Sequence, residues 1–235
     1  MRATVVFFAL LLFVSCKQET KQVFKVKYTG ALKDMMSGDI SKTIDLDTLS
    51  KKEHLYALGA YENLKGEIQI FNGAAFNSRV KDSLIAIENN FTGSASLLVY
   101  TQVEEWVENY SFFFASKTDL ERLLIDEAKR LGIDVSNPFP FILEGTISEL
   151  QWHVINWDAN DTIHTHQKHQ NSGINETLRN EEVVILGFYS TQHKAIFTHH
   201  SSNTHMHFRT KDQSLAGHVD ALKINDSITL KLPKL

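Results

Sequence analysis

The sequence has little of several features that would mark particular classes of protein. It has one cysteine and three prolines among 235 residues, so it can form neither an intrachain disulfide framework nor a proline-rich segment. Its net charge of −4 at pH 7 provides no basic surface, and nucleic-acid binding is not expected. With 43% hydrophobic and 22% charged residues, the chain can bury a sizeable core in one large or two small domains.

Long apolar runs are also scarce, and the longest one predicts a targeting segment. Arg2 precedes the apolar residues Val5–Val14, a run too short to cross a bilayer but suited to a signal peptide. The run ends at Ser15-Cys16, which resembles a bacterial lipobox, and polar residues follow to Gln22. The alternative is a plain secretory signal with a free thiol.

We therefore expect residues 1–15 to be a signal peptide, and residues 16–22 to be a lipidated cysteine with a polar tether. The remaining residues, 23–235, should form a soluble domain. It should be exported and held at the membrane by the lipid alone, on the periplasmic or cell-surface side.

Period-two alternation of apolar and polar residues dominates the rest of the chain and predicts strands. One long helix is predicted over Ser116–Gly132, with a polar cap, an apolar face and a terminal glycine. A short helix is predicted within residues 38–50 and a polar loop over residues 158–175. The predicted fold is α+β: a strand-rich architecture of two layers or two subdomains, with halves 23–140 and 141–235 and one main covering helix.

Histidine is the residue in excess. Ten of the 11 histidines fall between His153 and His218. In a strand, His205 and His207 share one face. A turn centred between Asp212 and Gln213 would place His207 opposite His218, with Cβ atoms about 4.5–5.5 Å apart.

Three imidazoles on one hairpin suit Zn²⁺, which would keep a fourth position open. The same register places Asp220 opposite His205, where it could accept that ring's free N–H. The alternative is a hairpin whose histidines face solvent. His164, His166 and His169 lack apolar neighbours and predict a solvated loop, and His199 and His200 are expected at the mouth of the site.

The segments "LGFYS", "THMHF" and "GHV" together resemble the C-terminal signature of the α-acetolactate decarboxylase family. In that family two histidines spaced by one residue, and a third eleven residues later, bind zinc. His205, His207 and His218 match in type and spacing. "YTGALKDMMSGDISKTIDLDTL", "LKGEIQI" and "LEGTI" resemble further family segments, so the similarity extends from about Val23 to Pro233.

The resemblance also indicates where this chain differs from the family. Glu67 matches an active-site glutamate. The family has a substrate-binding arginine at the position of His153, and a glutamate near the metal at the position of Ser227, beside Asp226. The resemblance thus implies that the three metal ligands are present, while the family's carboxylate-binding arginine and its glutamate near the metal are replaced.

The resemblance implies a carbon–carbon lyase that decarboxylates 2-acetolactate to acetoin, with Glu67 and His153 as catalytic residues and zinc as cofactor. Two alternatives remain open at this point. One is a zinc lyase, isomerase or hydrolase for another small hydroxy-keto acid, and the other is a zinc-binding lipoprotein without catalysis. The expected partner is a small anionic substrate, and a homodimer is compatible with the sequence.

Overall fold

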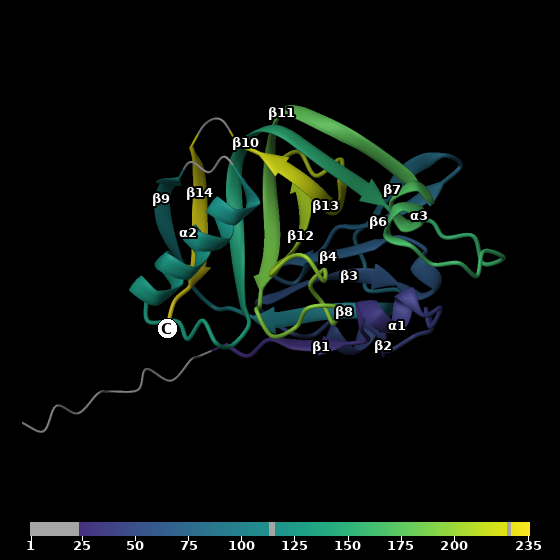
Figure 1. The fold of residues 1–235 in the computed structure, drawn as a ribbon, viewed down its shortest axis with the longest axis horizontal. Helices are drawn as coiled ribbons and strands as arrows, with labels where there is room; N and C mark the ends of the chain where they lie inside the picture. The colour runs from purple at the N-terminus through teal and green to yellow at the C-terminus, as the bar shows by residue number, and fades with distance from the viewer. Residues whose placement is uncertain (1–23, 113–115, 225–226) are drawn as a thin grey trace, which may run out of the picture.

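The structure is a computed structural model that describes residues 24–112, 116–224 and 227–235 (Figure 1). The predicted signal peptide, Cys16 and the polar tether lie outside the described residues. Within the described part of the chain, no helix is both long and apolar enough to cross a membrane.

Two β-sheets form the body of the protein. In the described residues the first sheet has the strand order β1-β8-β3-β4-β6-β7, with β2 paired to β8 and β5 to β4. Its strands are β1 (Lys27–Thr29), β2 (Ile44–Asp45), β3 (Leu55–Tyr61), β4 (Glu67–Phe71), β5 (Ala74–Ala75), β6 (Asn77–Lys81), β7 (Leu84–Glu88) and β8 (Ser94–Gln102).

The second sheet has the order β11-β12-β13-β10-β14-β9. Its strands are β9 (Trp106–Phe112), β10 (Phe139–Val154), β11 (Ile174–Tyr189), β12 (Thr204–Thr210), β13 (Ala216–Lys223) and β14 (Ile228–Pro233). The long strands β10 and β11 also pair with each other, so β10, β11, β12 and β13 form a closed ring of neighbours. The pair formed by β10 and β11 arches over the top of the molecule in Figure 1.

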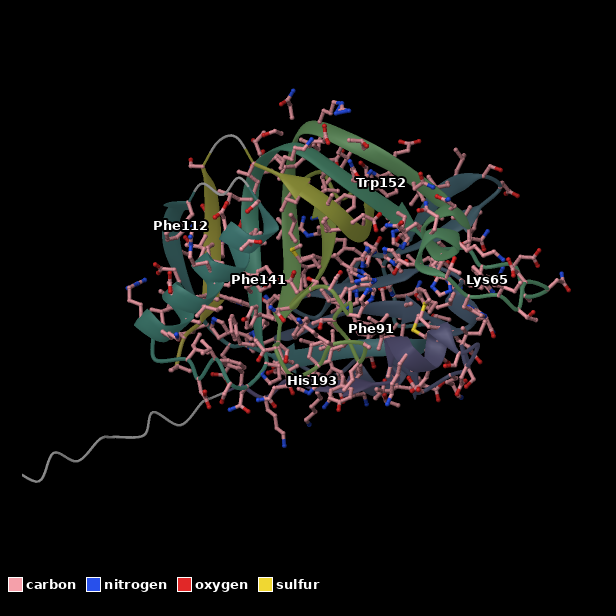
Figure 2. The ribbon with its side chains drawn as sticks, viewed as in Figure 1. Lys65, Phe91, Phe112, Phe141, Trp152 and His193 are labelled. Carbon is pink, nitrogen blue, oxygen red and sulfur yellow. The ribbon has the colours of Figure 1, made fainter. Side chains whose placement is uncertain are left out.

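The two sheets form two layers that share one hydrophobic core. Leu58 and Leu97 of the first sheet belong to the same buried cluster as Leu186 and Phe208 of the second. Figure 2 shows the side chains that fill the molecule, with Phe141 and Trp152 labelled on β10. The predicted α+β class is therefore confirmed, and of the two architectures left open the structure has the layered one.

A smaller cluster covers the other face of the first sheet. Leu46 and Leu49, on a 3-10 helix (η1, Leu46–Leu49), pack there against Ile68 and Ile70 of β4. Since alternate side chains of a strand point to opposite faces, Glu67 and Gln69 point toward the second sheet. The first sheet thereby supplies polar groups to the space between the layers.

The predicted long helix is confirmed as α2 (Lys117–Arg130). Its N-cap Ser116 accepts a hydrogen bond from the Asp119 backbone N–H, as Ser does at helix starts. Leu120, Leu124 and Ala128 are buried in the shared core. The helix lies in front of β10 and β14 in Figure 1.

The shorter helical segments agree only in part with prediction. The short helix predicted within residues 38–50 corresponds to η1, while α1 (Leu32–Met36) was not predicted. The predicted polar loop at residues 158–175 contains α3 (His166–Asn171) and the first residues of β11. A further 3-10 turn, η2 (Glu62–Leu64), joins β3 to β4. These segments are too short for periodicity to define them, and their contacts with the sheets fix them instead.

Candidate metal centre

The β12–β13 hairpin carries the three histidines in the predicted register. His207 pairs with His218, followed by Phe208 with Gly217 and Arg209 with Ala216. The pairing depends on the length of the turn, which is a local property of the sequence. The predicted cross-strand position of His218 is therefore confirmed.

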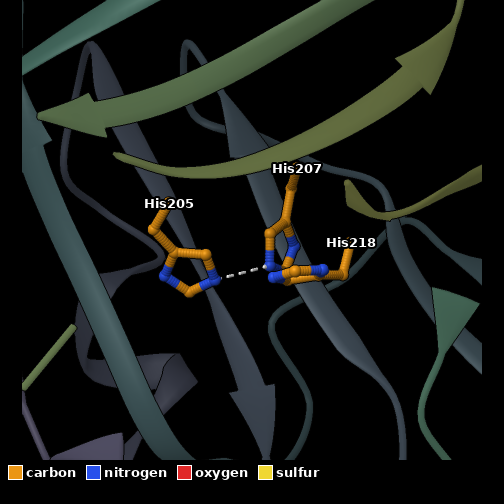
Figure 3. A group of neighbouring side chains, drawn as sticks. All are labelled: His205, His207 and His218. Atoms are coloured by element: carbon orange, nitrogen blue, oxygen red, sulfur yellow. Dashed lines mark hydrogen bonds between the residues drawn. The ribbon is translucent and has the colours of Figure 1, made fainter. Parts of the chain in front are cut away.

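The three imidazoles converge on one point, as Figure 3 shows. One ligand atom from each of His205, His207 and His218 lies within 4.8 Å of the others. His205 Nε2 and His207 Nε2 are 3.3 Å apart. Two ligands of a tetrahedral zinc ion, bonded at about 2.0–2.1 Å, lie roughly 3.3–3.4 Å apart. The donor set and its spacing therefore fit a tetrahedral metal ion.

Gln69 fixes the protonation of His207. The Gln69 amide Nε2 donates to Phe76 O and Ser78 Oγ, so its Oε1 is free to accept from His207 Nδ1 at 2.9 Å. A neutral His207 that carries its proton on Nδ1 presents a bare Nε2. That lone pair points at the site shared with His205, as in a metal ligand whose second nitrogen is hydrogen-bonded.

Burial keeps the ligand rings neutral. It lowers the pKa of both His205 and His207 well below the usual value. The charge of His218 adds to the effect at His205, and the charge of His205 adds to it at His207. Metal ions bind only unprotonated imidazole nitrogens. The environment therefore keeps the ligand nitrogens of His205 and His207 free of protons near neutral pH.

Asp220 does not contact His205, contrary to prediction. Its carboxylate accepts from His153 Nδ1 at 2.9 Å and from Gln170 Nε2 at 2.7 Å, and lies 3.5 Å from His218 Nδ1. The described pairing of β12 with β13 ends at His207 and His218. From there β13 pairs with β10 alone. The Asp220 side chain therefore faces His153 on β10.

The charge of Asp220 is set by these hydrogen bonds. Burial acts to raise the pKa of Asp220, but the hydrogen bond from His153 and the charges of His153 and the neighbouring His218 outweigh it and hold the pKa far below its usual range. Asp220 is therefore ionised. It orients His153 and His218, as carboxylates behind metal-binding histidines commonly do.

Glu67 reaches the same place from the first sheet. Its Oε2 lies 3.8 Å from His207 Nε2, and its Oε1 lies 3.7 Å from His153 Nε2 and accepts from the Ile155 backbone N–H. Burial raises the pKa of Glu67 to about 8, against the opposing effects of the His218 charge and the Ile155 hydrogen bond. In the protein without a bound metal ion, this buried carboxyl group therefore carries a proton near neutral pH.

The other position that departs from the family pattern is not at the site. Ser227 is exposed at the start of β14, beside Gly145 of β10, and is absent from the described lining of the histidine cavity. Asp226 lies outside the described residues. The structure therefore brings together Glu67, His153 and the three predicted ligands, but not Ser227.

The predicted solvated loop of histidines is wrong for two of its members. The His164 ring stacks on Trp157 with centroids 4.5 Å apart, and its Nδ1 lies 2.9 Å from His169 Nε2. His169 is buried, and burial lowers its pKa to about 4, with the charge of His164 as the next cause. These two rings pack around Trp157 because α3 folds the segment back onto the sheet.

A cavity of about 660 Å³ borders two of the three histidines, His205 and His218, together with Glu67 and His153. His166 and His199 line it with their rings 4.6 Å apart, and His200 packs on His199. The expected place of His199 at the mouth agrees with this arrangement. A substrate in the cavity would contact both the metal-binding rings and Glu67.

Sequence reasoning missed two positioning residues, Gln69 and Gln170. Gln69 could have been found, because it lies two residues after Glu67 and so shares its face. Gln170 could not, because its contact with Asp220 depends on the fold of the segment that contains α3.

An open group of three histidines beside a buried carboxylic acid has the components of a metal-assisted lyase or hydrolase site. The chain belongs to the alpha-acetolactate decarboxylase family, whose model matches residues 26–235. No curated protein sequence matches the chain significantly.

Solved structures share the fold. An alpha-acetolactate decarboxylase from Bacillus subtilis strain 168 is 14% identical, with a TM-score of 0.69 over 90% of this chain and 86% of that one. An acetolactate decarboxylase from Bacillus subtilis subspecies spizizenii is also 14% identical, with a TM-score of 0.71 over 90% and 87%. A Staphylococcus aureus protein of unknown function, described as similar to alpha-acetolactate decarboxylase, is also 14% identical. Its TM-score is 0.69, over 88% of this chain and 85% of that one. At this identity the likeness is one of fold alone.

Replacing Gln69 with leucine should weaken metal binding by about 10- to 100-fold, because His207 loses the acceptor that fixes its tautomer. Competition with a chromogenic chelator measures the affinity. Gln102→Leu, on the exposed end of β8, is the matched control and should bind metal like the unaltered protein. Equal affinities in the two variants would contradict the role given to Gln69.

The triple variant His164→Gln, His166→Gln, His169→Gln should retain one tightly bound metal ion per chain. None of these rings belongs to the converging group of His205, His207 and His218. Metal analysis after gel filtration in the presence of a weak chelator measures the stoichiometry. A loss of the metal from a variant with an unchanged circular dichroism spectrum would move the site to the α3 segment.

Proposed function

We propose that the protein is a zinc-dependent decarboxylase that converts 2-acetolactate, a 2-hydroxy-3-keto acid, into acetoin and carbon dioxide. Family membership supports the reaction class. The observation that carries the proposal is the position of Glu67, whose carboxyl oxygen lies 3.8 Å from a nitrogen of the three-histidine group.

Zinc is the ion that the donor set fits best. Three neutral imidazoles with an open fourth position are typical of catalytic zinc, whereas magnesium and calcium prefer oxygen ligands. Bound there, zinc would act as a Lewis acid toward the neighbouring ketone and hydroxyl oxygens of the substrate.

The residues of the chain account for the remaining chemistry. The bond between C2 and the carboxylate carbon breaks, carbon dioxide leaves, and the electron pair passes into an enolate over C2, C3 and the ketone oxygen. Glu67, protonated and buried, donates its proton to the C2 carbon, and the enolate returns to the ketone of acetoin. One proton from solvent then restores Glu67, so the reaction consumes one proton for each carbon dioxide released. The buried setting of Glu67 keeps water from competing for the reactive carbon.

His153 occupies the place where the family has arginine. Its Nδ1 is held by Asp220, so its Nε2 is the atom that faces Glu67 and the cavity. An arginine could bind a carboxylate through two parallel N–H groups, while this imidazole offers one. Positive charge for binding the substrate would therefore come mainly from the metal.

The second candidate is a zinc lyase or isomerase for another hydroxy-keto acid. The observation in its favour is the charge of the cavity wall. Among its described lining residues the single lysine or arginine is Lys223, which is paired with Glu149. An acid that depends less than 2-acetolactate on a cationic side chain for binding its carboxylate would suit that wall.

Glu67→Gln should lower acetoin formation from racemic 2-acetolactate by at least about 100-fold, since the amide cannot act as the acid. Zinc content should stay at one ion per chain, because Glu67 is not one of the three ligands. Glu53→Gln, at an exposed position, is the control and should keep full activity. An active Glu67→Gln protein would refute the assigned proton donor, and zinc-loaded unaltered protein that makes no acetoin would refute the decarboxylase.

His153→Arg should raise kcat/KM for 2-acetolactate by about tenfold, mainly through a lower KM, because a guanidinium binds carboxylate bidentately. Steady-state kinetics on the zinc-loaded proteins measures this change. His153→Lys serves as the comparison, since it adds charge without the planar fork. A fall in kcat/KM for both variants would show that His153 serves a different substrate.

We also propose that the domain is exported and anchored by a lipid on Cys16, from the apolar run and the Ser15-Cys16 junction in the sequence. Cys16→Ser should release the protein from membranes into the soluble fraction. Fractionation of cells followed by immunoblotting measures the distribution, with the unaltered chain as reference. Full retention of Cys16→Ser with the membrane would contradict the anchor.

A further inference from the structure

The cavity that borders His205 and His218 is also lined by apolar side chains. Leu120 of α2, Met206 of β12, and Val219 and Ala221 of β13 line it together with His205 and His218. Met206 lies between His205 and His207 in sequence, and Val219 follows His218. Because side chains alternate along a strand, these apolar residues belong to the sheet face opposite the histidines.

One cavity can border both faces because the sheet is open at this point. The described pairing of β12 with β13 ends at His207 and His218. Beyond that pair, Thr204 to Met206 bond to β11 alone, and Val219 to Lys223 bond to β10 alone. The two strand ends separate, and the opening between them forms a passage from the metal centre toward α2.

Four residues that border this passage are apolar, and the cavity as a whole exceeds what the small acid needs. Its volume of about 660 Å³ is within the range that holds drug-sized ligands. 2-Acetolactate has only two methyl groups to place against apolar walls. A substrate held by its oxygens at His205 and His218 would direct a carbon substituent into the passage.

We propose that the preferred substrate is a 2-hydroxy-3-keto acid whose alkyl substituent is several carbons longer than methyl, and that this chain lies in the passage lined by Leu120, Met206, Val219 and Ala221. This inference rests on the proposed function for the polar end of the substrate. It goes beyond it by assigning a subsite and a substrate class.

Alkyl hydroxamates test the passage without turnover, since the hydroxamate group chelates zinc and the alkyl chain probes the space beyond it. The zinc-loaded protein is titrated calorimetrically with acetohydroxamate, butanohydroxamate and hexanohydroxamate. Burial of each methylene should improve the dissociation constant about fourfold, so the series should span roughly 100-fold or more. A flat series, or no binding of any member, overturns the proposal.

Two substitutions test whether the gain in affinity with alkyl length arises in the passage. Leu120→Phe and Ala221→Phe should reduce the gain across the series to less than about tenfold, while acetohydroxamate binds as before. Ala221 is exposed, so its variant tests the passage even if the buried position does not accept phenylalanine. Leu123→Phe, on the same helix but outside the described lining, is the control and should keep the full gain. An unchanged gain in both passage variants overturns the location of the chain.

A substrate series separates this inference from the proposed function. Acetolactate and its 2-butyl analogue are compared by carbon dioxide release, and we expect kcat/KM to favour the butyl compound by at least tenfold. Turnover of acetolactate with a flat hydroxamate series would leave the decarboxylase standing and remove the subsite. A steep hydroxamate series with no carbon dioxide from either acid would support the subsite and remove the decarboxylase.

Discussion

The hydrogen bond between Gln69 and His207 is the contact on which the site depends. It crosses from the first sheet to the second in the buried space between them, and it joins a strand that carries Glu67 to a hairpin that carries the histidines. A slip of one residue in β4 would turn Glu67 and Gln69 outward and Ile68 and Ile70 inward. The leucines of η1, which bury Ile68 and Ile70, therefore hold the proton donor in place from the opposite face.

The same buried space holds two carboxyl groups in different protonation states. Glu67 accepts one backbone hydrogen bond and burial raises its pKa, so it keeps its proton. Asp220, with hydrogen bonds from His153 and Gln170, stays ionised. A pair of acids separated in this way, one as donor and one as orienting anion, is a common arrangement in active sites. Here Asp220 orients His153, whose Nε2 faces Glu67.

The local parts of this arrangement could be predicted from the sequence, and the tertiary parts could not. The register of His207 with His218, the cap of α2 at Ser116 and the inward face of Glu67 follow from turn length, capping chemistry and alternation. The partner of Asp220 was wrong because β13 leaves β12 to follow β10, which no local pattern records. The packing of His164 and His169 on Trp157 was missed because polar composition alone predicted a loop. The resemblance predicted that Ser227 lies near the metal, and the structure puts it outside the described lining of the cavity.

The proposed function depends on the claim that a single ion binds to three histidines of one hairpin. X-ray absorption at the zinc edge on zinc-loaded protein, compared with His207→Ala, tests it most directly. The claim predicts three imidazole nitrogens at about 2.0–2.1 Å in the unaltered protein, and one imidazole fewer or no bound zinc in the variant. A spectrum with oxygen or sulfur ligands in place of imidazoles, or one that His207→Ala leaves unchanged, would contradict it.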